Sequence, residues 1–183
     1  MSEPPLRADA RRNRARILAA AVEVFDEHGT SASTEEVARR AGVAVGTVFR
    51  HFPTKSDLLA AIMKELRGRL AARAETLAAE GDPAALFTFF AEVVERAAGA
   101  RTVVHLLAAD GTDVGVAPQI AGLGEALDAL LARAREAGAV RAEVRLDEVI
   151  ALLTAACHGA LAAGWTPDLR HRTVTRLLDA LRP

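Results

Sequence analysis

The stretch STEEVARRAGVAVGTVFRHFPTKSDLL, residues 33–59, decides the fold of this chain. It predicts a short helix, a glycine turn, a second short helix and the start of a long third one. The hydroxyl of Thr34 can cap the first helix, because it can accept from a backbone N–H that lacks a partner. Gly42 ends that helix, since glycine adopts the left-handed conformation without steric cost. Val37, Ala38 and Ala41 give the helix a small apolar face, which favours the close crossing of a helix-turn-helix.

The second helix, about Val45 to His51, is expected to be the recognition helix. Val48, Phe49 and Phe52 are predicted to face inward. The other side combines small side chains with one arginine, which suits the reading of base edges in a major groove. Gly46 costs roughly 1 kcal/mol against Ala in a helix. A close approach of its backbone to DNA would compensate for that cost.

This stretch resembles the DNA-binding domain of the TetR family of bacterial transcriptional repressors. The resemblance covers about residues 11–60 and rests on VARRAGVAVGTVFRHFPTKSDLL, which follows a helix that ends at Gly29. The apolar residues of that first helix are Ile17, Leu18, Ala21, Val22 and Phe25. The family usually has Tyr where this chain has Phe49. The phosphate hydrogen bond expected from that hydroxyl cannot form, so we expect Phe49 to serve packing alone.

The resemblance implies a homodimeric repressor that binds a near-palindromic double-stranded DNA operator and is released by a small-molecule effector. Ala44, Val45, Thr47 and Arg50 are expected to read the bases. Thr34, His51, Lys55 and the arginine-rich start of the first helix are expected to anchor the protein on the DNA phosphates. The full set of expected DNA-binding residues is Arg14, Thr34, Ala44, Val45, Gly46, Thr47, Arg50, His51 and Lys55. Two alternatives remain: a DNA-binding regulator without an effector, and, less favoured, a small-molecule-binding helical enzyme.

The net charge of −1 conceals an asymmetry between the two parts of the chain. Residues 1–55 carry nine Lys/Arg and seven Asp/Glu, net +2, whereas residues 56–183 carry fourteen and seventeen, net −3. The basic excess therefore lies with the helix-turn-helix, although it supports only a few phosphate contacts.

The single Cys157 excludes an intramolecular disulfide and fits a reducing cytoplasm. We expect a cytoplasmic protein without a signal peptide, since Glu23 interrupts the one early apolar run.

The periodicity predicts an all-α protein of about nine helices: an arm and helix-turn-helix domain over residues 1–54, and a ligand-binding and dimerisation bundle over 55–183. Residues 1–10 are expected to form a mobile arm. Arg11, Arg12, Arg14 and Arg16 follow it as DNA contacts or as a solvated helix start. Further helices are expected over about 56–79, 83–98, 101–109, 118–137, 146–164 and 168–181, with a loop at 110–115.

The last two predicted helices form either a dimerisation surface or the closing layer of the subunit's own core. Between Glu148 and Asp168 lie nineteen residues without a formal charge, VIALLTAACHGALAAGWTP. Their length would permit a membrane span, but His158, Thr154 and the predominance of alanine favour a helix that is buried on most sides. Because the family typically dimerises in this way, we expect a homodimer through these two helices and no membrane partner.

We find no pattern for catalysis, a metal or a cofactor. Cys157 and His158 are neighbours on a helix and point about 100° apart, so a packed cysteine is favoured over a reactive pair. His105 is either a core histidine or a ligand contact. The resemblance implies a cavity in the bundle for a hydrophobic or amphipathic effector. The residues that could line it are Met63, Phe87, Phe90, Val94, His105, Leu127 and Cys157.

Overall fold

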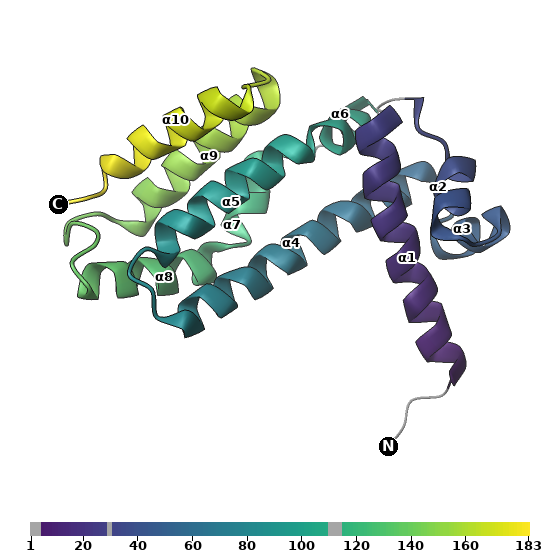
Figure 1. Ribbon diagram of the computed structural model, residues 1–183, viewed down its shortest axis with the longest axis horizontal. Coiled ribbons are helices and arrows are strands. Elements are labelled where there is room, and N and C mark those ends of the chain that lie inside the picture. Colours follow the sequence, from purple (N-terminus) through teal and green to yellow (C-terminus); the bar gives the residue numbers. More distant parts are fainter. Residues whose placement is uncertain (1–4, 29–30, 110–114) are drawn as a thin grey trace. The chain divides into compact units, whose positions relative to one another are not determined.

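The computed structural model describes residues 5–28, 31–109 and 115–183, and all regular structure in that part of the chain is helical. The helices follow in the order α1 (Pro5–His28), α2 (Thr34–Ala41), α3 (Val45–His51), α4 (Lys55–Glu80), α5 (Ala85–Gly99), α6 (Arg101–Ala109), α7 (Val116–Ala121), α8 (Gly124–Glu136), α9 (Leu146–Ala162) and α10 (Pro167–Asp179) (Figure 1). The all-α prediction is therefore confirmed. The expectations for residues 1–4, for Gly29 and for most of the 110–115 loop lie outside the described residues.

Two predicted boundaries differ from the structure. The mobile arm predicted over residues 1–10 is wrong for residues 5–10, because α1 begins at Pro5. Proline is tolerated in the first turn of a helix, where its missing N–H would have no partner in any case. The helix predicted over 118–137 is divided into α7 and α8, and two glycines, Gly122 and Gly124, flank the break. Glycine is a poor helix former, so the described part of the chain contains ten helices instead of about nine.

The chain forms two compact units. The N-terminal unit comprises Met1–Glu65 and Thr102–Asp113, and the bundle unit comprises Leu66–Arg101 and Val114–Pro183. The single helix α4 therefore contributes its first residues to one unit and the remainder to the other. The boundary predicted after residue 54 stays a prediction.

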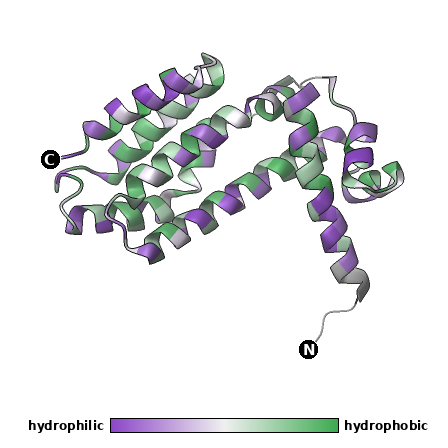
Figure 2. Cartoon of the chain, in the orientation of Figure 1, coloured by the Kyte–Doolittle hydropathy of each residue, from purple (hydrophilic) through white to green (hydrophobic). Residues whose placement is uncertain are grey.

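The core of the bundle unit is built around α9, which packs against α5, α7, α8 and α10. Its largest fully buried side chains include Phe89, Phe90, Leu131 and Leu153. Hydrophobic residues run along the helices of this unit, whereas the N-terminal half of α1 is largely hydrophilic (Figure 2). Burial of apolar surface is the main stabilising contribution in such a core.

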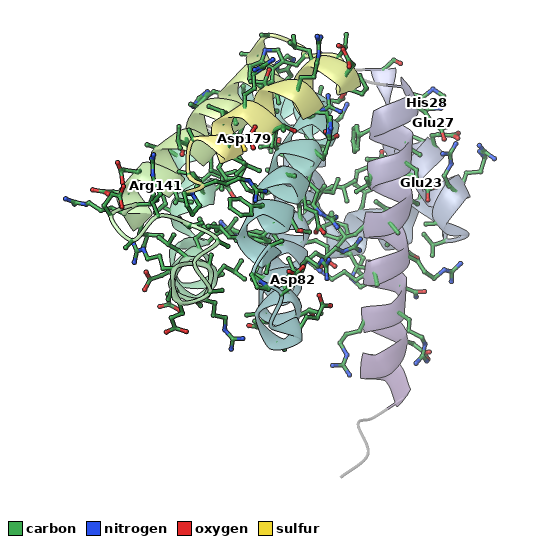
Figure 3. The ribbon with its side chains drawn as sticks, turned by 60° about the vertical axis from the view of Figure 1, so that its left-hand side comes forward. Glu23, Glu27, His28, Asp82, Arg141 and Asp179 are labelled. Atoms are coloured by element: carbon green, nitrogen blue, oxygen red, sulfur yellow. The ribbon has the colours of Figure 1, made fainter. Side chains whose placement is uncertain are left out.

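The end of the chain is fixed to the loop that precedes α9. The backbone N–H of Arg141 donates to the carbonyl of Leu181 at 3.0 Å, and its guanidinium donates to the carbonyl of Ala180 at 2.7 Å. Arg141 and the nearby Asp179 are labelled in Figure 3.

Within the described residues, none of the helices combines the length and the apolar character that a membrane crossing demands.

Candidate nucleic-acid interface and effector site

The N-terminus of α2 is capped by Ser33. The hydroxyl of Ser33 accepts from the backbone N–H of Glu36 at 3.1 Å. The prediction that Thr34 caps this helix is therefore wrong, because Thr34 is already its first helical residue. The spacing of Ser33 and Glu36 matches the S-x-x-E signature of a capping box, so the sequence itself identifies Ser33 as the cap. A role for Thr34 in DNA binding stays a prediction.

The turn between α2 and α3 depends on Gly42, which has φ 63° and ψ 41°. This left-handed conformation lets the N–H of Val43 donate to the carbonyl of Ala38 at 3.0 Å, which closes the end of α2. Arg16 of α1 also reaches this end. Its guanidinium donates to the carbonyls of Ala41 at 2.6 Å and Gly42 at 3.3 Å. Arg16 thus holds α1 against the turn.

Arg40 forms a second connection between α1 and α2. Its two terminal nitrogens donate to the two carboxylate oxygens of Glu27, each at 2.6 Å. Glu23 lies 3.8 Å from Arg40, one turn before Glu27 on α1 (Figure 3). The hydrogen bond from Arg40 holds the pKa of Glu27 below its ordinary value. This network fixes the angle at which α1 supports the helix-turn-helix.

The short helix α3 has a clearly divided surface. Val48 is fully buried and Phe52, which follows it by one turn, is 3% exposed. Phe49 is 43% exposed, so the prediction that it faces inward is wrong. The reason is geometric: residues i and i+4 share a face of a helix, whereas residue i+1 lies about 100° away. The sequence contains this signal, because Val48 and Phe52 are four residues apart and Phe49 falls outside that period.

The predicted base-reading residues lie around the exposed side of α3. Ala44, Gly46 and Arg50 are exposed, while Val45 and Thr47 are half-buried. No hydrogen bond or ion pair joins Arg50 to another residue in the described part of the chain. The arginine can therefore present its planar donors to an acceptor outside the protein. The role of each residue in DNA binding stays a prediction.

The predicted anchoring residues have contacts within the protein. The ammonium of Lys55 donates to the carbonyl of Ala32 at 3.0 Å and lies 5.4 Å from the ring centroid of Phe25. The guanidinium of Arg14 lies 5.3 Å from the ring centroid of Phe52. Both side chains are half-buried, as is His51. Since ammonium and guanidinium groups have several donors, these contacts position the cations without using all of their hydrogen-bonding capacity.

The predicted effector-binding residues are divided between the units. Phe87, Phe90, Val94, Leu127 and Cys157 belong to one buried cluster of the bundle unit. Met63 and His105 belong to the N-terminal unit, where Met63 is half-buried and His105 is exposed. His105 is therefore not a core histidine. The assignment of these residues to an effector site stays a prediction.

Cys157 and His158 point in different directions on α9, as their spacing predicted. Cys157 is 1% exposed, whereas His158 is exposed. Burial raises the pKa of the Cys157 thiol to about 12. The thiolate is the reactive form of cysteine, so the folded chain keeps this side chain in its unreactive state.

The sequence matches two family models. Residues 17–62 match bacterial regulatory proteins of the tetR family, and residues 82–183 match the C-terminal domain of SbtR-like transcriptional regulators. These two regions contain the helix-turn-helix and most of the bundle unit.

Similar structures agree with the family models. The crystal structure of a TetR transcription regulatory protein from Mycobacterium vanbaalenii is similar over 98% of this chain and 100% of that chain, with 40% identity and a TM-score of 0.79. A TetR transcriptional regulator from Streptomyces coelicolor shows 33% identity and a TM-score of 0.73, over 93% of this chain and 98% of that chain. An HTH-type transcriptional regulator from Staphylococcus aureus is 44% identical over 54 residues, 29% of this chain and 29% of that protein's length.

Proposed function

Because the chain belongs to the TetR family of bacterial transcriptional regulators, we propose that it is a homodimeric repressor, released from DNA by a small molecule. The observation that carries this proposal is the exposed side of α3, which presents Arg50 without a partner in the described residues. The cap at Ser33, the turn at Gly42 and the Arg40–Glu27 pair fix that side in place. An arginine without an internal partner, on a helix that is held in place, can donate hydrogen bonds to base edges in the major groove.

Dimerisation is proposed through α9 and α10. The side of α9 that does not face the core exposes Ala151, Ala155, His158 and Ala162, and no formally charged residue lies between residues 149 and 167. On α10, Leu169 is 40% exposed. A second copy of the chain would cover the uncharged side of α9 together with Leu169 of α10, and would place two α3 helices on two half-sites of a near-palindromic operator.

Regulation by an effector is proposed through the bundle unit and α4. The core there contains the apolar residues Phe87, Phe90 and Leu127, which supports the proposal of a hydrophobic or amphipathic effector. Because α4 contributes to both units, a shift of its second half would change the position of Lys55 at its start. By linkage, the preference of the effector for the free protein equals the loss of DNA affinity that it causes.

Arg50→Ala tests the DNA-binding part of the proposal. We expect a loss of about 1–3 kcal/mol in binding free energy to specific DNA, and a smaller loss on random DNA, if Arg50 reads a base. Arg39→Ala is the matched control, because Arg39 is paired with Glu36 on its own helix. Equal losses on specific and random DNA would show that Arg50 contacts only phosphates. Unchanged binding by Arg50→Ala would contradict the assignment of α3.

A further inference from the structure

The exposed side of α3 has a composition that DNA binding by an arginine alone does not explain. Successive residues of an α-helix are about 100° apart around the axis. With Val48 buried, Gly46, Phe49 and Arg50 occupy the side of α3 that lies away from the core, and all three are exposed. We call these three residues the outer face of α3. It combines a glycine, which has no side chain, with an aromatic ring and a cation.

Gly46 is not required by the fold. Its φ lies outside the left-handed region, and no heavy atom lies within 4 Å of the position that a Cβ would occupy. Any residue could adopt this backbone, and glycine weakens the helix by roughly 1 kcal/mol relative to alanine. The space at Gly46 is therefore open toward the outside of the protein. A small group of a bound partner can enter it.

Phe49 borders this space. It follows Gly46 by three residues, so the two lie on adjacent turns of one side of the helix. Helical side chains lean toward the N-terminus, so the ring of Phe49 points toward the end of α3 that begins at Val45. In a helix-turn-helix, the first residues of the recognition helix contact base edges. This direction takes the ring toward the bases.

The chemistry of phenylalanine determines which group it can contact there. Its side chain has no N–H or O–H, so it cannot bind a phosphate oxygen through a hydrogen bond. On the major-groove edges of the bases, the apolar group is the 5-methyl of thymine, and phenylalanine is a suitable contact for it. Building on the proposed function, we infer that each operator half-site carries a thymine whose methyl group packs against Phe49, in the space left at Gly46.

The test replaces single methyl groups of the DNA. A binding site obtained by in vitro selection with the full chain is resynthesised with uracil in place of each thymine of the half-site, one position at a time. For the unmodified protein we expect one position at which affinity falls about fourfold per half-site, the effect of exposing one buried methyl group. The same change in both half-sites is expected to reduce affinity about fifteenfold.

Variants of the outer face assign this effect to a residue. Phe49→Ala is expected to bind thymine and uracil DNA equally at that position, while Phe49→Leu keeps part of the preference. Gly46→Ala fills the space and is expected to reverse the preference toward uracil. Arg50→Ala is the control: it binds more weakly overall but keeps the ratio. The circular dichroism spectrum of each variant serves as the control that it is folded.

The outcomes separate this inference from the proposed function. If selection yields a symmetric site but thymine and uracil bind equally at every position, the methyl contact is wrong and the repressor proposal stands. An unchanged ratio in Phe49→Ala also overturns the contact. If selection with the unmodified protein yields no preferred sequence, the proposed function itself fails.

Discussion

Two glycine-to-alanine substitutions at positions four residues apart, Gly42 and Gly46, are expected to change stability in opposite directions. Gly42 has φ 63°, a conformation that costs an alanine about 1–2 kcal/mol. A Cβ there would also lie 2.7 Å from a terminal nitrogen of Arg16, which would have to give up its position at the end of α2. Gly42→Ala is therefore expected to destabilise the N-terminal unit by at least this amount.

Gly46→Ala provides the matched control. The position lies within α3, its φ is outside the left-handed region, and a Cβ would meet no atom within 4 Å. The substitution is expected to stabilise the unit by about 0.5–1 kcal/mol, because alanine is the better helix former. It is nevertheless expected to weaken DNA binding, because the added methyl group occupies the outer face of α3.

Urea unfolding followed by far-UV circular dichroism measures both changes. The fluorescence of Trp165, the single tryptophan of the chain, reports on the bundle unit and serves as an internal reference. Equal effects of the two substitutions on the unfolding free energy, or a stabilising effect of Gly42→Ala, would show that the turn does not depend on the left-handed conformation of Gly42. If the Gly46→Ala protein is stabilised and binds DNA normally, the space at Gly46 is not needed for DNA binding.

Three further predictions concern the remaining contacts. Arg40→Ala removes the connection from α2 to Glu27 and is expected to lower the melting temperature more than Arg39→Ala, whose pair lies within α2; equal effects in a thermal scan would contradict this role. Gly159→Ala would place a Cβ 2.2 Å from Cζ2 of the Trp165 indole and is expected to cost about 1–3 kcal/mol in a urea titration; Gly68→Ala, where a Cβ meets nothing within 4 Å, is the stabilising control. Because burial raises the pKa of Cys157 to about 12, its thiol is expected to resist iodoacetamide at pH 8 and to react once urea unfolds the chain, as mass spectrometry would show; rapid labelling of the folded protein would contradict its burial.

The sequence predicted the local elements well where one residue decides a boundary. Gly42 has a left-handed φ and ends α2, and α3 ends at His51, two residues before Pro53. The apolar period predicted the buried face of α2 correctly, since Val37, Ala38 and Ala41 are all buried. These features depend on backbone geometry and on period, which are properties of short stretches.

The missed features depend on competition between neighbouring residues. Ser33 and Thr34 both have hydroxyls, and the S-x-x-E spacing to Glu36 is what distinguishes Ser33 as the cap. Phe49 follows the buried Val48, and its exposure shows that position on the helix outweighs hydrophobicity. The contacts of Lys55 with Ala32 and of Arg14 with Phe52 join residues far apart in the chain, so no local pattern could reveal them.

In vitro selection of DNA by the full chain, followed by measurement of the stoichiometry on the selected site, tests whether the chain recognises DNA as a homodimer through α3. A homodimer that places two α3 helices in successive major grooves is expected to select two half-sites related by dyad symmetry. Their centres are expected to be separated by about one turn of DNA, or a multiple of it. Each site should bind two copies of the chain or a multiple of two. Selection of a single unsymmetrical site bound by one copy, or the absence of any preferred sequence, would contradict recognition of DNA by a homodimer.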